Sequence, residues 1–569
     1  MRNSEVAEVL YEIADFLELE DVEWKPRAYR RAAQTIETLP KDIQEVYEDG
    51  ELKDIPGVGE SIAEKIQEYL ETGSLEYLEE LREKLPEGLR DLMMIEGVGP
   101  KTAKTLYEKL QISNLDQLEA AAREKRIRKL KGFGEKTEQE ILDGIKRYRS
   151  KQERFLLGYI LPSAEQVKER LEALDYVSKV IIAGSLRRMR ETIGDMDVLV
   201  VSEKPKKVMD FFTEMSDVGR VVSKGERKST IVLTNSLQID LMLIEEENFG
   251  AALQYFTGSK AHGVALRGIA VNKGLKLSEY GLVDRENGEK VAGEDEEGIY
   301  RVLVSSYIEP EMRENRGEIE AAVKGELPDL VKMSDIKGDL HTHSNWSEGA
   351  YSIEEMAKKA KSLGLKYIAM CDHTKSLPIA RGLDEERFKE RQKEIEKVNN
   401  EISGLTVLSG AEVNIDSEGK LDLKDSALSD LDFVIASIHS GFKQSESKMT
   451  ERILSAIQNQ NVDAIGHPTG RLIQDRPPYN VDLDKVFKAA SDTGVIMEIN
   501  AFPTRLDLSD VNILKAREYG VRFCIGTDSH SVDHLNYIRL GVATARRGWL
   551  SKEDVVNTLT AKKLLKSLR

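Results

Sequence analysis

The stretch Ala183–Val200, AGSLRRMRETIGDMDVLV, decides the architecture of the central part of this 569-residue chain. Its end, GDMDVLV, predicts a turn that enters a β-strand. Successive side chains of a strand point to opposite faces, so Asp195 and Asp197 lie on the same face of the sheet. Downstream, LQIDLMLI (Leu237–Ile244) predicts a second apolar strand that carries one acid, Asp240. If the two strands are neighbours, three carboxylates converge at one place.

Converging carboxylates need a counter-charge, because two unit charges 4 Å apart repel by about 4 kcal/mol at an effective dielectric constant near 20. Divalent cations such as Mg²⁺ supply it. Upstream, the Gly184–Ser185 turn and the cations Arg187, Arg188 and Arg190 suit phosphate oxygens. Acids that bind metal beside cations that bind phosphate predict a phosphoryl-transfer site. A solvated Asp-x-Asp turn is the simpler interpretation of the acids alone.

These motifs and their order resemble the DNA polymerase X family, the group that contains polymerase beta. The motifs are GSLRR, GDMDVLV, QIDL and, at Tyr255–Ser259, YFTGS. The resemblance implies that Asp195, Asp197 and Asp240 are catalytic and hold two Mg²⁺ ions while a primer 3′-OH attacks a deoxynucleotide. The nucleotide site that it implies comprises Gly184, Ser185, Arg188, Tyr255, Phe256, Gly258 and Arg267. Gly263 stands where the family often has an asparagine that touches the base, which implies looser base discrimination.

The first 150 residues read almost wholly as helices, and one pattern recurs there three times. IPGVGESIAEKI (55–66), IEGVGPKTAKTL (95–106) and LKGFGEKTEQEI (130–141) each place Gly-x-Gly before a helix. Glycine allows a close approach of the backbone, and a helix N-terminus offers free N–H groups to a phosphate. The pattern resembles the helix-hairpin-helix motif and predicts sequence-independent DNA binding. The glycines concerned are Gly57, Gly59, Gly97, Gly99, Gly132 and Gly134.

Within the first copy, Lys65 occupies the position of the lyase nucleophile of polymerase beta. The resemblance implies that Lys65 attacks the sugar of an abasic site through a Schiff base. The segment KPRAYRRAA (25–33) matches the flanking helix and places Lys25 and Tyr29 near that pocket. Ser61 stands where the family often has a phosphate-binding lysine. A solvated helix lysine is the alternative interpretation of Lys65.

Seven of the eight histidines follow residue 340, and their placement points to metal. Short apolar strands end in metal-type residues six times, in DLHTH, YIAMCDH, LTVLSGAE, FVIASIH, VDAIGH and FCIGTDSH, and VIMEIN (495–500) is a seventh strand of the same kind. Helical patterns lie between them. The alternation predicts a parallel barrel whose ligands gather at the carboxyl ends of its strands. Imidazole together with carboxylate suits Zn²⁺ or Mn²⁺.

This set resembles the polymerase and histidinol phosphatase (PHP) domain, a seven-stranded barrel with three metal ions. The implied ligands are His341, His343, Glu348, His373, Glu412, His439, His467, Asp528 and His530. Glu348 stands where an aspartate is more usual. Arg471 has two open interpretations, a phosphate ligand or a structural role at the surface, and His534 fits no strand end.

The predicted fold is multidomain: a helical N-terminal part, an α+β nucleotidyltransferase palm with a further polymerase subdomain, and a (β/α)7 barrel. The predicted boundaries are 1–85 (lyase-like, DNA-binding), 86–150 (helix-hairpin-helix), 151–245 (palm), 246–315 (nucleotide and template binding), 316–334 (linker) and 335–569 (PHP barrel).

Composition limits the class of protein. The net charge is −18, yet Ala121–Arg149 holds ten Lys/Arg against five Asp/Glu, and such local patches set phosphate contacts. Cys371 and Cys524 lie in apolar strands and read as buried residues. No signal peptide and no membrane-spanning run is found. We therefore expect a soluble cytoplasmic protein without membrane partners, and nothing demands more than a monomer.

The predicted function is DNA-directed DNA polymerase activity that fills gaps during repair, with gapped or nicked DNA and deoxynucleoside triphosphates as partners. The PHP barrel predicts a 3′→5′ exonuclease, with abasic-site cleavage or 3′-phosphate removal as further outcomes. One alternative is a scaffold that binds DNA ends and polymerises weakly. Another is an RNA-directed nucleotidyltransferase or a small-molecule phosphatase, which the three DNA-backbone motifs disfavour.

Overall fold

The contacts of this computed structural model divide the chain into two units, Met1–Glu153 and Arg154–Arg569. The structure describes residues 2–19, 22–37, 39, 43–72, 75–83, 92–93, 95, 98–130, 132–152, 154–377 and 380–568. Within these ranges, no helix combines the length and the apolar character that a membrane span needs.

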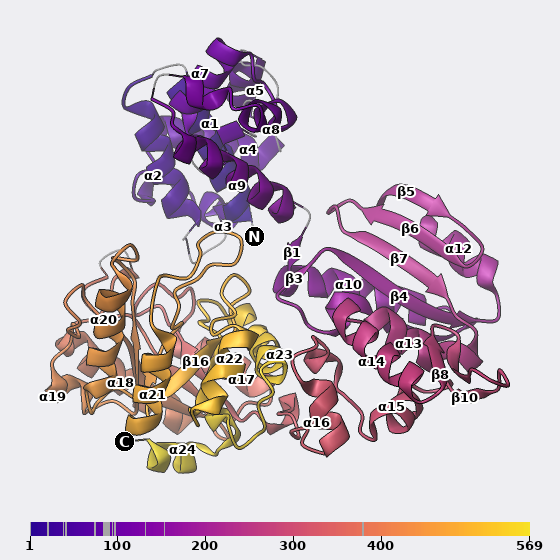
Figure 1. Cartoon of the computed structure of the whole chain (residues 1–569). Coiled ribbons are helices and arrows are strands. Elements are labelled where there is room, and N and C mark those ends of the chain that lie inside the picture. The colour runs from indigo at the N-terminus through magenta and orange to yellow at the C-terminus, as the bar shows by residue number, and fades with distance from the viewer. Residues whose placement is uncertain are drawn as a thin grey trace. The chain divides into compact units, whose positions relative to one another are not determined.

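In its described residues the first unit consists of helices and the turns that join them, without a strand (Figure 1). In the first helix, Val6, Leu10, Ile13 and Leu17 are buried at spacings of three and four, which is the pattern of an amphipathic helix. Its helices are α1 (Arg2–Leu19), α2 (Lys25–Glu37), α3 (Ile43–Glu48), α4 (Glu60–Thr72), α5 (Glu76–Glu83), α7 (Pro100–Leu110), α8 (Leu115–Arg123) and α9 (Glu135–Gln152).

The first large sheet of the second unit has five strands in the order β2-β4-β7-β6-β5, and Figure 1 labels four of them, β4 to β7. Strands β4 and β7 run parallel, and the other neighbours are antiparallel. The strands are β2 (Val177–Ile182), β4 (Asp195–Ser202), β5 (Val218–Lys224), β6 (Lys228–Leu233) and β7 (Gln238–Leu243). Two short strands, β1 (Phe155–Leu156) and β3 (Thr192–Ile193), form a separate antiparallel pair. In the chain, β1 precedes β2, and β3 directly precedes β4.

The two faces of β4 enter different cores, as its alternation predicts. Met196 and Val198 pack with α10 (Leu157–Glu172) and α12 (Pro205–Thr213). Leu199 and Val201 pack instead with α13 (Phe249–Thr257). The acids of β4 share the face of Leu199, so they project at the α13 side of the sheet.

After the sheet come α13, α14 (Lys260–Asn272), α15 (Glu296–Val304) and the small sheet β8 (Leu275–Ser278), β9 (Gly281–Asp284) and β10 (Lys290–Ala292). The segment predicted as a linker, 316–334, contains α16 (Glu318–Lys324). Buried Glu318 pairs with His262 (Oε1 to Nδ1, 2.6 Å), and Val331 N–H donates to the carbonyl of Leu550 at 2.9 Å. This segment is therefore packed on both sides.

The remainder is a parallel seven-stranded barrel whose strands follow one another in sequence order. Figure 1 shows its outer helices in orange and yellow. Residues after the last strand close it against the first, because Asp528 N–H donates to the His341 carbonyl and His343 N–H to the Ser529 carbonyl, each at 2.8 Å. The strands are β11 (Gly338–Thr342), β12 (Tyr367–Met370), β13 (Thr406–Asn414), β14 (Phe433–Ser437), β15 (Ala464–Ile465), β16 (Ile496–Asn500) and β17 (Phe523–Gly526). The helical N-terminal part, the α+β palm and the (β/α)7 barrel that we predicted are confirmed.

Helices cover the outside of the barrel, and their starts are set by local chemistry. Ser352, Asp384, Ser445, Asp482 and Ser509 each accept a backbone N–H at the first turn of the helix that follows. The helices are α17 (Ile353–Ser362), α18 (Glu385–Glu401), α19 (Asp425–Leu428), α20 (Glu446–Gln458), α21 (Leu483–Thr493), α22 (Asp510–Glu518), α23 (Ile538–Arg547) and α24 (Ala561–Ser567).

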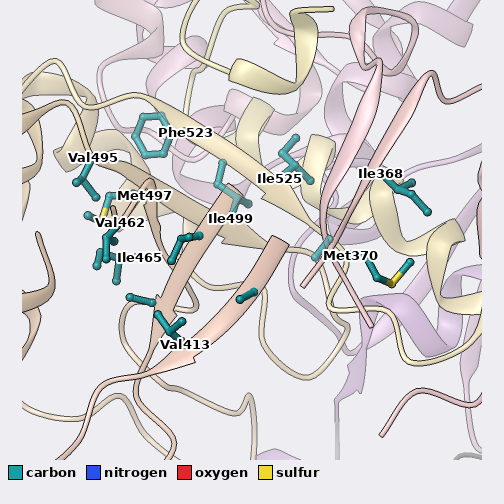
Figure 2. Close-up of a cluster of buried hydrophobic side chains, with 14 of the residues drawn as sticks. Ile368, Met370, Val413, Val462, Ile465, Val495, Met497, Ile499, Phe523 and Ile525 are labelled. Carbon is teal, nitrogen blue, oxygen red and sulfur yellow. The ribbon is translucent and has the colours of Figure 1, made fainter. Parts of the chain in front are cut away.

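Alternate residues of the barrel strands form two separate cores. Ile368 and Ile525 belong to the core that the outer helices cover, and Figure 2 shows this cluster. Tyr367, Cys371 and Cys524 belong to the other core, inside the barrel. Both cysteines are buried and free, as predicted. The strands are thus buried on both faces, which leaves their carboxyl ends as the place for polar residues.

Candidate active sites

The first site forms where β4 and β7 run side by side. Asp197 lies directly opposite Asp240 in the parallel pair, and Asp195 lies opposite Gln238. The adjacency on which the prediction depended is therefore confirmed, and the three carboxylates meet at one edge of the sheet. Burial, together with the charges of Asp195 and Asp240, raises the pKa of Asp197 to about 7. Such a group binds a proton or a cation readily.

The turn before these acids requires glycine for two reasons. Gly184 has a φ of +64°, and a Cβ there would lie 2.4 Å from Oδ2 of Asp197. The backbone also joins the two segments, because Ala183 N–H donates to the Asp197 carbonyl at 2.8 Å. The short helix α11 (Gly184–Arg187) follows. The Gly-Ser turn is thus pressed against the acidic edge.

A cavity of about 630 Å³ opens beside this turn. The seven predicted nucleotide-binding residues, Gly184, Ser185, Arg188, Tyr255, Phe256, Gly258 and Arg267, all line it, together with Asp195 and Asp197. Its other lining residues include Arg190, Ser259, Lys260, Gly263 and Glu314. The cavity therefore joins an acidic edge to a cationic wall, as a nucleoside triphosphate with metal requires.

Aromatic side chains form the far wall of the cavity. The rings of Tyr255 and Phe256 are 5.2 Å apart in an edge-to-face arrangement, and the Arg267 guanidinium lies 6.0 Å from the Tyr255 ring. Tyr255 is 44% exposed, so it is a residue of the cavity wall and not a core aromatic. A Cβ at Gly263 would meet Nη1 of Arg267 at 3.3 Å. An asparagine there would displace the flexible end of that arginine.

Two residues of this site were not predicted. Lys228 of β6 donates to Oδ2 of Asp240 at 2.6 Å, and the other oxygen of Asp240 is buried without a partner. Glu314 accepts from Nε of Arg188 at 3.1 Å. Lys228 looked like an ordinary strand lysine, and Glu314 lies in the segment after α15 where no motif marks it. Arg187 is structural, since it pairs with Glu296 at 2.8 Å.

The second site lies at the carboxyl ends of the barrel strands. Three overlapping groups bring their ligand atoms within 4.8 Å of one another. They are His341–His343–Asp528, His343–His373–His530 and His373–Glu412–His439. Glu348 joins them through Oε1, which lies 2.9 Å from Nε2 of His373 and 3.0 Å from Nε2 of His530. Nε2 of His467 lies 2.9 Å from Oε1 of Glu412. All nine predicted ligands are therefore gathered at one mouth.

The donor atoms of this mouth fit metal ions. Buried polar atoms without a hydrogen-bond partner include Nε2 of His341, both ring nitrogens of His343, Nδ1 of His467 and Oε2 of Glu412. Leaving a buried polar group unpaired is costly, and bound cations would satisfy these atoms together. The mixture of imidazole and carboxylate suits Zn²⁺ or Mn²⁺.

The pKa values of the histidines shift in different directions, depending on the charges that surround each ring. Burial and the neighbouring rings of His530 and His373 lower the pKa of His343 to about 3, which keeps the ring neutral and able to bind a cation. Burial also lowers the pKa of His467, to about 4. Burial acts in the same sense on His341, but the carboxylates of Glu498, Asp528 and Glu412 outweigh it and raise the pKa well above its ordinary value.

Five family models match the chain in succession. They are a helix-hairpin-helix domain (residues 1–75), a SAM-like helix-hairpin-helix tandem (89–147), the DNA polymerase beta palm (161–262), the DNA polymerase beta thumb (252–314) and the PHP domain (339–502). The DNA polymerase/3′-5′ exonuclease PolX of Bacillus subtilis (strain 168) is 36% identical over 565 residues, which cover 99% of this chain and 98% of that protein. The chain belongs to DNA polymerase family X. It is a DNA polymerase of that family with a C-terminal PHP domain, as predicted.

The barrel of this family X polymerase also has free-standing relatives. A probable phosphatase of Thermoanaerobacter sp. (strain X514) is 35% identical over 231 residues, 39% of this chain and 89% of that protein. A probable phosphatase of Caldicellulosiruptor saccharolyticus is 36% identical over 204 residues, 34% of this chain and 80% of that protein. The barrel therefore occurs both alone and joined to a polymerase.

A second layer of side chains surrounds the metal-type ligands of this family X barrel. Buried Glu498 accepts from Nδ1 of His341 through Oε1 at 2.6 Å and from the His467 N–H through Oε2 at 2.5 Å. A carboxylate on the far nitrogen fixes a ligating imidazole in one tautomer and orientation. Glu498 was not predicted, although an acid inside the apolar strand VIMEIN was the available signal. Asp372 is structural, since it pairs with buried Arg391 at 2.9 Å.

Two residues left open by their sequence are now placed. Arg471 donates to Oε2 of Glu191 and to the carbonyls of Arg505 and Leu506. This favours the structural interpretation over the phosphate ligand. His534 accepts from the His530 N–H at 3.3 Å and stacks on Tyr537, so it lies beside the metal-type cluster and supports its rim.

The glycines that we predicted to bind DNA differ in their structural requirements. Gly57 and Gly132 have φ values of +93° and +92°, which favour glycine. A Cβ at Gly59, Gly99 or Gly134 would meet nothing within 4 Å. Packing within the protein does not demand glycine at these three positions, where α4, α7 and α9 begin. Gly97 lies outside the described residues.

Lys65 of α4 has both polar and aromatic neighbours. Its Nζ donates to Oγ of Ser61 at 3.2 Å and lies 4.8 Å from the centre of the Tyr77 ring. Burial, together with Tyr77, raises the pKa of Tyr29 to about 12. Lys25 begins the exposed end of α2. The role of Lys65 as a nucleophile stays a prediction.

Proposed function

We propose that this family X enzyme fills short gaps in DNA during repair, and that its barrel trims the 3′ ends that the polymerase then extends. The observation that carries the first half is the parallel register of Asp197 with Asp240 beside the Gly184–Ser185 turn. It places an anionic edge and an anion-binding turn on one cavity. Two cations bound to the acids would neutralise the anionic edge, and a triphosphate bound to the arginines would neutralise the cationic wall.

In the polymerase site, Asp195, Asp197 and Asp240 would hold two Mg²⁺ ions. When bound, these ions lower the pKa of the primer 3′-OH and stabilise the departing pyrophosphate. Ser185 and Arg188 would bind the triphosphate oxygens, and the Tyr255–Phe256 pair would line the sugar pocket. Arg267, held near Tyr255, would face the template side.

In the barrel, the nine predicted ligands would hold three ions, either Mn²⁺ or Zn²⁺. Bound ions of this kind activate water and polarise a phosphate ester. Glu498 keeps the His341 ring oriented toward them. The relative that is a DNA polymerase/3′-5′ exonuclease supports DNA 3′ ends as the substrate. The relatives that are probable phosphatases support removal of a 3′-phosphate, and abasic-site cleavage is a further proposed activity of the same site.

The helical unit would hold the gapped or nicked DNA. Helix N-termini at Gly59, Gly99 and Gly134 offer backbone N–H groups to phosphates on the DNA strand. Lys65 would remove the sugar of an abasic site by elimination from the imine, which leaves a 5′-phosphate on the downstream side of the gap. A gap-repair role unites these separate chemistries on one substrate.

The test is one duplex with a single-nucleotide gap, incubated with and without deoxynucleotides in Mg²⁺, Mn²⁺ or Zn²⁺. We expect primer extension with nucleotides and primer shortening without them. Asp197→Ala should abolish extension and retain shortening, whereas His341→Ala should do the opposite. Extension by Asp197→Ala would contradict the polymerase assignment, and shortening by His341→Ala would contradict the nuclease assignment. Each variant serves as the folding control for the other.

A further inference from the structure

Three guanidinium groups converge on the Glu314 carboxylate at the wall of the polymerase cavity. Arg188 lies 3.1 Å from it, Arg190 3.6 Å and Arg547 3.1 Å. The Glu314 side chain is 10% exposed. The first two arginines belong to the nucleotide-binding turn. Arg547 comes from α23, the helix that covers the barrel.

Both terminal nitrogens of the Arg547 guanidinium donate hydrogen bonds. Its Nη1 also donates to the carbonyl oxygen of Arg188 at 2.6 Å. Its Nη2 donates to Oδ2 of Asp510 on α22 at 2.6 Å, and the side chain is 4% exposed. A buried arginine with this many directional contacts has little freedom to move. It therefore ties the backbone of the triphosphate-binding turn to two helices of the barrel.

The charge at Glu314 creates a difficulty for the proposed reaction. A triphosphate that enters the cavity is an anion, and Arg188 is one of the groups that must meet it. Glu314 holds the same guanidinium through Nε, while Nη1 donates to the carbonyl oxygen of Thr257 at 2.5 Å. If Glu314 depended on Arg188 alone, its carboxylate would compete with the triphosphate for that cation. Arg547 gives the carboxylate a second, permanent partner.

We propose that Arg547 is a positioning residue of the polymerase site, supplied by the PHP barrel. It neutralises Glu314 and holds the main chain of Arg188, which weakens the competition of Glu314 with the triphosphate for the Arg188 side chain. The proposal rests on the proposed role of Arg188 as a triphosphate ligand. It makes nucleotide affinity, and not only folding, depend on the barrel.

The neighbouring residue offers a matched control. Arg546, also on α23, pairs with Oε1 of Glu311 at 2.7 Å and donates to the carbonyl of Val331 at 3.1 Å. Its contacts join the same parts of the chain with the same chemistry. The Arg546 side chain bonds to Glu309, Glu311 and Val331, and none of these residues lines the cavity. Loss of Arg546 should therefore report on the interface alone.

The experiment measures KM and kcat for one deoxynucleotide on gapped DNA with the full-length chain. Arg547→Ala should raise KM on the order of tenfold, the effect of losing one charge-assisted contact, and should change kcat far less. Arg547→Lys, which keeps the charge without the two-ended fork, should fall between. Arg546→Ala should leave KM unchanged. Primer shortening by the barrel, assayed on the same preparations, reports on folding.

A double variant isolates the carboxylate. Because Glu314→Gln removes the charge that competes for Arg188, Arg547→Ala with Glu314→Gln should recover most of the lost affinity. Failure of this recovery, an unchanged KM in Arg547→Ala, or an equal rise in Arg546→Ala would each overturn the proposal. If Arg547→Ala and Arg547→Lys both lose primer shortening, Arg547 is structural and the proposal is also overturned. Arg188→Ala is measured beside them. If it binds nucleotide normally, the proposed role of Arg188 fails separately.

Discussion

Nδ1 of His341 lies 2.6 Å from Oε1 of Glu498, and both residues are fully buried at the mouth of the barrel. The pair leaves Nε2 of His341 without a hydrogen-bond partner, 3.5 Å from Oε2 of Glu412 and 3.8 Å from Oδ1 of Asp528. Glu498 thus determines which nitrogen of His341 faces the cluster. It acts on the site without being among the predicted ligands.

Glu498→Gln should weaken metal binding by about 10- to 100-fold, because the His341 ring loses the negative charge that raises its basicity, and an amide has only one oxygen to accept from both the His341 ring and the His467 N–H. Titration calorimetry with Mn²⁺ or Zn²⁺ on chelated protein measures this directly. Glu390→Gln, at an exposed position of α18, is the matched control and should bind as the unmodified protein does. An unchanged affinity in Glu498→Gln would show that the His341 ring is held by other contacts.

Protonation of Asp197 should govern the magnesium requirement of the polymerase. Its pKa is raised to about 7, so the site loses its anionic form as pH falls through that value. Below it, the Mg²⁺ concentration for half-maximal extension should rise by about tenfold per pH unit. Rates measured at several Mg²⁺ concentrations between pH 6 and 8.5 test this. A requirement that does not change with pH would contradict it.

The same shift predicts a stability effect in chelated protein. The folded state binds a proton on Asp197 that the unfolded state has already released above its ordinary pKa of 3.8, so stability falls as pH rises from there to about 7. Asp197→Asn removes this pH-dependent loss of folding stability, because asparagine does not titrate. Its gain in unfolding free energy should be larger at pH 8 than at pH 5 by about 1–3 kcal/mol. Chemical denaturation at the two pH values measures the difference, and a gain independent of pH would refute the linkage.

Period-two alternation made the polymerase acids predictable, since a strand leaves no choice about which face Asp195 and Asp197 share. The barrel ligands were predictable because parallel strands bring their carboxyl ends together whatever helices intervene. In both cases the chemistry follows from the local pattern and one rule of topology. The glycine at position 184 also follows a local rule, because the turn there has a positive φ, which favours glycine.

Residues that arrive from distant segments were not predictable. Lys228 reaches Asp240 only because β6 pairs antiparallel with β7. Glu314 and Arg547 meet at Arg188 through tertiary packing across more than 200 positions of the chain, as their separation of 233 shows. No local spacing records such a meeting. Glu498 was visible as an acid in an apolar strand, but its partner could not be read from the strand itself.

Gly184→Ala should abolish primer extension and destabilise the chain by about 1–3 kcal/mol. The added Cβ would meet the Asp197 carboxylate at 2.4 Å, and the φ of +64° strains any other residue. Extension assays and thermal unfolding measure the two effects. Gly268→Ala is the control, since its Cβ would meet nothing within 4 Å. Primer shortening by the barrel should survive in both, and an active Gly184→Ala would show that the turn can shift away from the acids.

Lys65→Ala should remove the proposed lyase activity without affecting gap filling. An imine formed between Lys65 and an abasic sugar is reduced by borohydride to a stable protein–DNA bond, which a denaturing gel detects as a slower band. The control is Lys53→Ala, an exposed lysine paired with Glu60 at 2.7 Å in the preceding turn, which should trap as the unmodified protein does. Equal trapping by Lys65→Ala and the unmodified protein would assign the nucleophile to another amine. Loss of trapping in both variants would instead point to impaired DNA binding, which a filter-binding measurement on the same abasic duplex distinguishes.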